Sequence, residues 1–230
     1  TNYFLAGAQD NGTHQLNGAG LTSSVEILGG DGGYVAIDQD EPQFQTGTYV
    51  FANFRRSANG GANWTSGPSN NSGQFINPYD YDDANDRVYA GTSSNSYLRW
   101  ENPQSGFTYT TVGLATLGGS IASVCVSPFT ANRVFFGTTN GNLVRADNAE
   151  ATPTGTSLST GAGLPAGAYL NCINLGSTEQ NMVITYTNYG VNNVWVSNNG
   201  GTSWTAIDGN LPNMPVYWAM FHPDDNTKMF

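Results

Sequence analysis

Short apolar segments recur along the chain at a nearly constant interval, separated by stretches rich in Gly, Asn, Ser and Thr. Alternation of apolar and polar residues over short runs is typical of β-strands. One series of predicted strands begins near residues 3, 49, 88, 134 and 182. A second series, at 34–38, 124–128, 170–173 and 217–223, precedes most members of the first. No long segment holds an apolar stripe with a helical period, so the pattern predicts an all-β protein built from one repeated unit.

Two turns in this pattern share a motif that ends in tryptophan. Ser57–Trp64 reads S-x-N-x-G-x-N-W, and Ser197–Trp204 reads S-x-N-x-G-x-S-W. Asn and Gly tolerate the positive φ angles that a tight hairpin needs, and the Asn side chain can bond the amides of its own turn. Both tryptophans are predicted to pack into the core of the repeat.

The spacing of the two motifs gives the repeat length. The tryptophans are 204 − 64 = 140 residues apart, which is three periods of about 47 residues. Degenerate copies of the turn are expected between them, at 102–109 and 155–158. A fixed period in this range predicts a β-propeller of four-stranded blades, with about five repeats present. An all-β sandwich with coincidental Gly-rich turns is the alternative.

The repeats run through the whole chain, so residues 1–230 are predicted to form a single propeller domain or a fragment of one. The chain begins and ends inside a repeat. A closed five-bladed ring and part of a larger propeller both fit this phase, and we expect the latter.

Charge is sparse and predominantly negative. Only 10% of the residues are charged, the net charge is −10, and Lys228 is the sole lysine. Such a chain lacks the basic surface that nucleic acid or an anionic membrane requires. It also has no apolar run of about 18 residues, so membrane insertion is not expected. This composition predicts a protein that is secreted or exposed at the cell surface, of bacterial type.

The two cysteines, Cys125 and Cys172, occupy matching strands one repeat apart. Equivalent positions on packed sheets lie about 10 Å apart, whereas a disulfide needs Cα atoms within about 7 Å. Two buried free thiols are therefore predicted, although secretion by itself favours a disulfide.

Candidate ligand-binding residues occur in two Gly-rich segments. Asp10 and Asn11 follow a predicted strand, and Asp31 sits in the link 29–33 that precedes the next one. Ordinary turns are the plain interpretation, because Asp-Asn-Gly is strong turn chemistry. The binding hypothesis requires Asp10, Asn11 and Asp31 to meet on one rim, with the two carboxylates within about 15 Å.

No catalytic, metal or cofactor site is predicted. The acidic run 80–86 could offer oxygen ligands to Ca²⁺, but it lacks the Gly and distal Glu of an EF-hand loop. Arg55 and Arg56 lead into a turn and do not make the arginine triad of a sialidase. A glycoside hydrolase needs two opposed carboxylates, and Asp10, Asp31 and Asp38 are available without a pair being singled out. His14 and His222 lie in no recognisable triad context.

Residues 6–13 (AGAQDNGT), residues 30–38 (GDGGYVAID) and the two tryptophan turns together carry a family resemblance. They resemble secreted Asp-box (BNR-repeat) β-propellers of Bacteroidetes-like bacteria, with Asn in place of the box Asp. That family is similar in architecture to sortilin-type propellers and to xyloglucan-degrading glycoside hydrolases. The resemblance implies export and a loop face that docks ligands.

These observations predict a non-catalytic extracellular module for binding or adhesion at the cell surface. Its expected partners are glycans or extracellular proteins, with further parts of its own chain or neighbouring subunits as alternatives. A glycoside hydrolase of the xyloglucanase-like class is the second hypothesis. A structural segment of a surface filament or large adhesin is the third.

Overall fold

The computed structural model describes residues 4–18 and 23–230, and the regular secondary structure within them is almost entirely β-strand. The exception to the strands is a 3-10 turn, Ala115–Leu117. None of the described segments is a helix long and apolar enough to cross a membrane. The chain divides into two compact units, which are treated separately below: unit 1 extends to Thr92 and includes Leu98–Val112, and unit 2 comprises Ser93–Tyr97 and Gly113–Phe230. A single domain over 1–230 stays a prediction.

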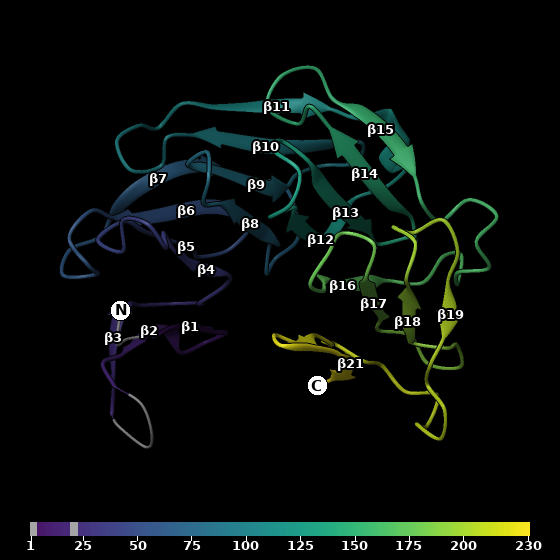
Figure 1. Cartoon of the computed structure of the whole chain (residues 1–230). Helices are drawn as coiled ribbons and strands as arrows, with labels where there is room; N and C mark the ends of the chain where they lie inside the picture. The colour runs from purple at the N-terminus through teal and green to yellow at the C-terminus, as the bar shows by residue number, and fades with distance from the viewer. Residues whose placement is uncertain (1–3, 19–22) are drawn as a thin grey trace. The chain divides into compact units, whose positions relative to one another are not determined.

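Three sheets contribute to unit 1, and in each the strands pair in chain order (Figure 1). The first is three-stranded: β1 (Phe4–Ala8), β2 (Gly12–Leu16) and β3 (Ser24–Leu28). The second is four-stranded: β4 (Val35–Ile37), β5 (Gln45–Thr48), β6 (Ala52–Ser57) and β7 (Thr65–Asn70). The third is β8 (Tyr79–Asp82), β9 (Arg87–Gly91), β10 (Ser96–Glu101) and β11 (Tyr109–Gly113), of which β10 begins in unit 2.

Unit 2 repeats the same arrangement. One four-stranded sheet is β12 (Ile121–Val126), β13 (Val134–Thr138), β14 (Leu143–Asp147) and β15 (Thr154–Ser157). The next is β16 (Leu170–Leu175), β17 (Met182–Tyr186), β18 (Val194–Ser197) and β19 (Thr205–Ala206). A two-stranded sheet follows, β20 (Phe221–His222) and β21 (Asp225–Met229).

Most predicted strands are confirmed, and the strand predicted at 49–52 is wrong. The second strand of that sheet is β5, four residues earlier, and Tyr49–Phe51 forms the turn that follows it, with Phe51 at φ 53°. The apolar run was the misleading signal, because the real strand is the polar but fully buried Gln-Thr-Gly-Thr. The segment 217–223 likewise contributes only Phe221–His222 to a strand.

The two tryptophan turns have the predicted local chemistry. In the first, Asn59 Oδ1 accepts the Asn63 amide at 2.9 Å, and Ser57 Oγ accepts the Gly61 amide at 3.0 Å. The second repeats both bonds at 2.9 Å, from the Ser203 amide to Asn199 Oδ1 and from the Gly201 amide to Ser197 Oγ. The glycines that follow each Asn adopt positive φ: Gly60, Gly61, Gly200 and Gly201. An Asn carbonyl therefore organises each turn.

The tryptophans themselves differ. Trp204 is 9% exposed, belongs to the core of unit 2 and donates to the Leu158 carbonyl at 3.2 Å, as predicted. Trp64 is only half-buried, and its indole donates to Gly61 within its own turn. Of the two predicted degenerate turns, the one at 102–109 is confirmed, because this segment leads from β10 into β11. The turn predicted at 155–158 is wrong: most of that segment belongs to β15, and the turn before it lies at 148–153.

Aromatic packing and polar side chains both connect one sheet to the next. In unit 1, Phe54 packs its ring against Tyr79 and Trp100 of the following sheet, both at 5.4 Å between centroids. In unit 2, Glu179 in the β16–β17 turn accepts from Arg133 and Ser127 of the preceding sheet. These links fix each sheet against the next because buried polar groups keep hydrogen-bond partners.

Both cysteines are free thiols, as predicted from their spacing. Cys172 is buried, and its Sγ lies 3.4 Å from the Ala219 carbonyl oxygen. Burial raises the pKa of the Cys172 thiol to about 11. Cys125 is only half-buried, which departs from the prediction of two buried thiols.

Candidate functional site

Asp10 and Asp31 are brought together in unit 1. The β1–β2 turn carries Asp10 and Asn11, and the link from β3 to β4 carries Asp31. The Asp10 amide donates to Asp31 Oδ1 at 3.0 Å, so the predicted proximity of the two acids is confirmed. Asp10 takes the left-handed conformation at φ 64°, which bends the turn toward the link.

The same geometry shows that part of this site is structural. One oxygen of Asp31 is committed to the turn, and the Asn11 amide group donates to the Gln9 carbonyl at 3.2 Å. Asp10 and Asn11 remain exposed, whereas Asp31 is half-buried. Ligand binding by Asp10, Asn11 and Asp31 stays a prediction, with Asp31 the member that faces a hollow.

That hollow has a volume of about 270 Å³ and is bounded by the first two sheets of unit 1. Its lining includes two charged side chains, Asp31 and Arg55, and one aromatic ring, Tyr49. Thr13 and Thr48, each 1% exposed, form polar parts of its wall. Its glycines bring the backbone close: a Cβ on Gly30, which has φ 88°, would lie 2.6 Å from the Tyr49 ring. The edge of the Tyr49 ring therefore lies against the Gly30 backbone.

Strand alternation explains why Arg55 reaches this hollow. Successive side chains of a strand point to opposite faces of the sheet. On β6, Phe54 and Arg56 face the third sheet, where Phe54 packs on Trp100 and Arg56 lies 4.7 Å from the Phe107 ring centroid. Arg55, between them, faces the first sheet. No ion pair between described residues includes Arg55.

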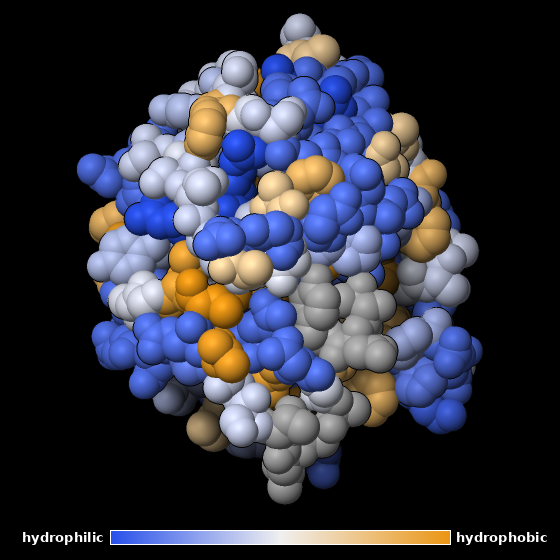
Figure 2. All heavy atoms as spheres, turned by 90° about the vertical axis from the view of Figure 1, so that its left-hand side faces the viewer, coloured by the Kyte–Doolittle hydropathy of each residue, from blue (hydrophilic) through white to orange (hydrophobic). Residues whose placement is uncertain are grey.

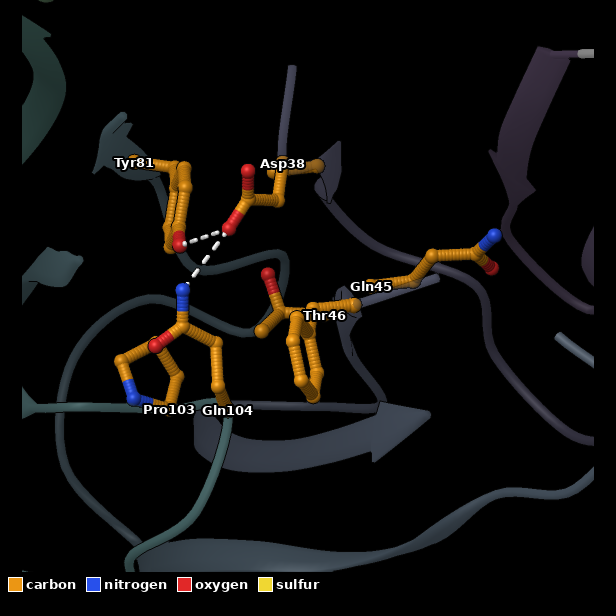
Figure 3. Close-up of a pocket in the computed structure, with 8 residues that line it drawn as sticks. Asp38, Gln45, Thr46, Tyr81, Pro103 and Gln104 are labelled. Carbon is orange, nitrogen blue, oxygen red and sulfur yellow. Dashed lines mark hydrogen bonds between the residues drawn. The ribbon is translucent and has the colours of Figure 1, made fainter. Parts of the chain in front are cut away.

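A tighter pocket in unit 1 is built around Asp38. Figure 3 shows the Tyr81 hydroxyl and the Gln104 amide pointing at its carboxylate, with distances to Oδ2 of 2.8 and 2.9 Å. Both donors also reach Asp86 Oδ1, at 3.0 and 2.5 Å. The free volume is about 10 Å³, room for one water molecule. This arrangement links three turns and leaves no space for a substrate.

The pKa shifts of Asp38 and Tyr81 agree with a structural role for this pocket. Burial raises the pKa of Asp38, but hydrogen bonds from the Glu41 amide, Gln104 and Tyr81 outweigh that effect and hold it below the usual range. Burial and the two neighbouring carboxylates raise the pKa of Tyr81 well above its usual value. The lowered pKa favours the anionic form of Asp38 at neutral pH, which suits a hydrogen-bond acceptor better than a general acid.

The acidic run 80–86 forms the end of β8 and its turn into β9. Asp82 is 4% exposed and accepts from the Asn85 amide group at 3.0 and 3.1 Å. Asp83 accepts from the Gln39 amide and shares a second hollow, of about 390 Å³, with Asp80 and Tyr81. Burial raises the pKa of Asp83, and the charges of nearby aspartates add to the effect. Among the described residues, no cluster of three or more acids, cysteines or histidines is placed to hold a metal.

Unit 2 presents large exposed side chains on the β17–β18 turn and on the link between β19 and β20. The most exposed are Tyr189 (75%), Tyr217 (68%) and Trp218 (55%). Asn193, fully buried, holds these segments by donating to the Asn188, Val191 and Met214 carbonyls. Figure 2 shows a different part of the surface, the left-hand side of Figure 1, where hydrophilic residues predominate around a smaller number of hydrophobic ones.

Sequence reasoning missed Arg55 and Asp83. In the sequence, Arg55 stands out only as a residue that leads into a turn, and Asp83 only as part of an acidic run that could bind Ca²⁺. Alternation along β6 was the available signal for Arg55, since Phe54 is apolar and its neighbour must face the other way.

Comparisons with known proteins reveal similarity in structure alone. Neither a protein-family model nor a curated protein sequence matches the chain. An ancestral GH74 enzyme superposes with a TM-score of 0.73 at 15% identity, over 98% of this chain and 32% of the enzyme. The GH74 xyloglucanase from Xanthomonas campestris gives 0.70 at 12% identity, over 98% of this chain and 39% of that protein. The chain therefore spans about a third of the length of these enzymes.

YCF48 from Cyanidioschyzon merolae is a third match, with a TM-score of 0.65 at 14% identity over 93% of this chain and 71% of YCF48. YCF48 bound to D1 peptide matches with a TM-score of 0.62 at 13% identity, over 93% of this chain and 66% of that one. At such identities the likeness shows the fold. The chain has a β-propeller fold with about five repeats, as the period predicted.

Proposed function

We propose that this chain is a non-catalytic, extracellular β-propeller module that binds a glycan or protein partner at the cell surface. The observation that carries the proposal is the hollow of unit 1, where Asp31, Arg55 and Tyr49 meet beside the Asp10 turn. A concave site with a few convergent polar groups and one aromatic ring is the usual form of a small-ligand site. The acid of the neighbouring pocket, Asp38, has a lowered pKa, which suits binding better than acid catalysis.

Secretion from a bacterium is part of the proposal. A net charge of −10 with a single lysine supports it, as do the tryptophan turns that resemble the Asp-box. Two kinds of structural neighbour support the proposed classes of partner. YCF48 has been solved with a bound peptide, which supports a protein partner, and the GH74 enzymes support a glycan.

The proposal is tested by measuring binding and turnover on the same protein. The purified chain is screened against a panel of polysaccharides and peptides, and any polysaccharide that binds is incubated with the protein and analysed for released sugars. We expect retention of at least one ligand with no released product. Reproducible hydrolysis that disappears in Asp10→Asn or Asp31→Asn would overturn the non-catalytic assignment, and failure to bind any member of a broad panel would overturn binding.

A glycoside hydrolase of the xyloglucanase-like class is the second candidate, and Asp83 is the observation that favours it. A general acid needs a raised pKa, and burial gives Asp83 one in a hollow that also holds Asp80. If this candidate is right, xyloglucan is hydrolysed and Asp83→Asn abolishes hydrolysis, whereas the exposed Asp40→Asn does not. Activity that survives in Asp83→Asn would exclude this acid.

A further inference from the structure

Within unit 1, Arg55 is a cation in a hollow that it shares with Asp31 without forming an ion pair. The protein has 17 acidic residues and 7 basic ones, so an arginine left without an acidic partner is unexpected on charge balance alone. A guanidinium presents a planar fork of donors that matches a carboxylate and can bind it in a bidentate manner. Arg55 donates from Nη1 to the Phe54 carbonyl at 3.1 Å, and its remaining donors can recognise an anionic ligand.

The other lining groups describe the rest of that ligand. Asp31 uses Oδ1 for the Asp10 amide, which leaves Oδ2 to accept from a hydroxyl group. Thr13 also lines the wall, almost fully buried. Tyr49 is 39% exposed and its ring is held against Gly30, so it offers a fixed apolar surface to a ring-shaped molecule.

The hollow is large enough to hold an occupant much bigger than one water molecule. Its volume, about 270 Å³, is more than tenfold the roughly 10–15 Å³ that a single water molecule needs on this scale. The exposed Asp10–Asn11 turn is a neighbour of this hollow, because its Asp10 amide donates to Asp31, which lines the wall.

We infer that this hollow binds a sugar ring bearing a carboxylate, that is, a uronic acid residue of an acidic glycan. Arg55 binds the carboxylate, Asp31 accepts from a ring hydroxyl, and Tyr49 covers one face of the ring. This inference rests on the proposed binding function and specifies its ligand.

The test uses two sugars that differ only at the carboxylate, galacturonic acid and galactose, in NMR chemical-shift titrations of the whole chain. We expect galacturonic acid to bind at least tenfold more tightly, which corresponds to about 1.4 kcal/mol, because a hydrogen bond to a charged group is stronger than one between neutral groups. Arg55→Gln should remove that preference, and Arg55→Lys should restore part of it. Lys228→Gln, the same charge change at a side chain 68% exposed in unit 2, should leave it intact.

The results that would overturn the inference also show whether the ligand class alone is wrong or the proposed binding function fails with it. Equal binding of both sugars, or a preference that survives in Arg55→Gln, would show that the ligand class is wrong while a binding function stands. Binding of acidic peptides but of neither sugar would assign the hollow to a protein partner. If the chain binds no member of the wider panel described above, the proposed function fails as well. Unchanged melting temperature and NMR spectra of the Arg55 variants confirm that folding is not the cause.

Discussion

Asp31 accepts a hydrogen bond from the backbone amide of Asp10 at 3.0 Å, although 21 residues separate them in the chain. The bond joins the turn of one sheet to the link that enters the next, at the edge of the hollow that holds Arg55 and Tyr49. Through it, the Asp31 side chain both orders the Asp10 turn and faces a candidate ligand.

Removing this bond should loosen the turn. Asp31→Ala is expected to lower the free energy of unfolding by about 1–3 kcal/mol, because the Asp10 amide loses a charged acceptor. Asp31→Asn keeps an acceptor oxygen and should cost less. Urea unfolding of both variants checks this, and equal stability of the two would show that the acceptor at position 31 is unimportant.

The two motif tryptophans should differ in their contribution to stability. Trp204→Ala is expected to cost about 3–5 kcal/mol, since it empties part of a buried core. Trp64→Ala should cost clearly less, because Trp64 is only half-buried and bonds within its own turn. Thermal and urea unfolding of each variant give the comparison, and an equal loss at both sites would contradict the difference in burial.

Asp38 should make the protein less stable in acid. Its pKa is lower in the folded chain than its ordinary value of 3.8, so its charged form stabilises the fold above that value and the contribution is lost as pH falls through the folded pKa. Asp38→Asn should therefore show a smaller loss of stability below about pH 4 than the unmodified protein. Parallel slopes of unfolding free energy against pH for the two proteins would refute this role.

The thiols should react at different rates. Burial and a pKa raised to about 11 keep Cys172 protonated and covered at pH 8, and the thiolate is the reactive form. Cys125 is half-buried and should be labelled first by iodoacetamide in the native protein. Mass spectrometry of the labelled peptides measures the order. Denaturant should remove the difference, and faster labelling of Cys172 in the native protein would contradict its burial.

The site was partly predictable from the sequence. The proximity of Asp10 and Asp31 followed from the phase of the repeat, because a turn after the second strand and a link into the next sheet fall on the same rim. Alternation along β6 places Arg55 on the face opposite Phe54, but the sequence does not say which neighbouring sheet Phe54 packs against. The polar strand Gln45–Thr48 was missed for a related reason: its burial comes from the sheets packed on both sides of it.

The amino-acid sequence alone was enough to predict the repeat, the all-β class and the chemistry of the two tryptophan turns. These depend on local preferences: the period of apolar strands, and Asn and Gly at positions of positive φ. Only the folded chain reveals the burial of Trp204, the half-buried position of Trp64, the structural use of Asp38, and the meeting of Asp31, Arg55 and Tyr49 in one hollow. Those outcomes arise where one sheet packs against the next, and the contacts involved join residues that no short sequence window contains.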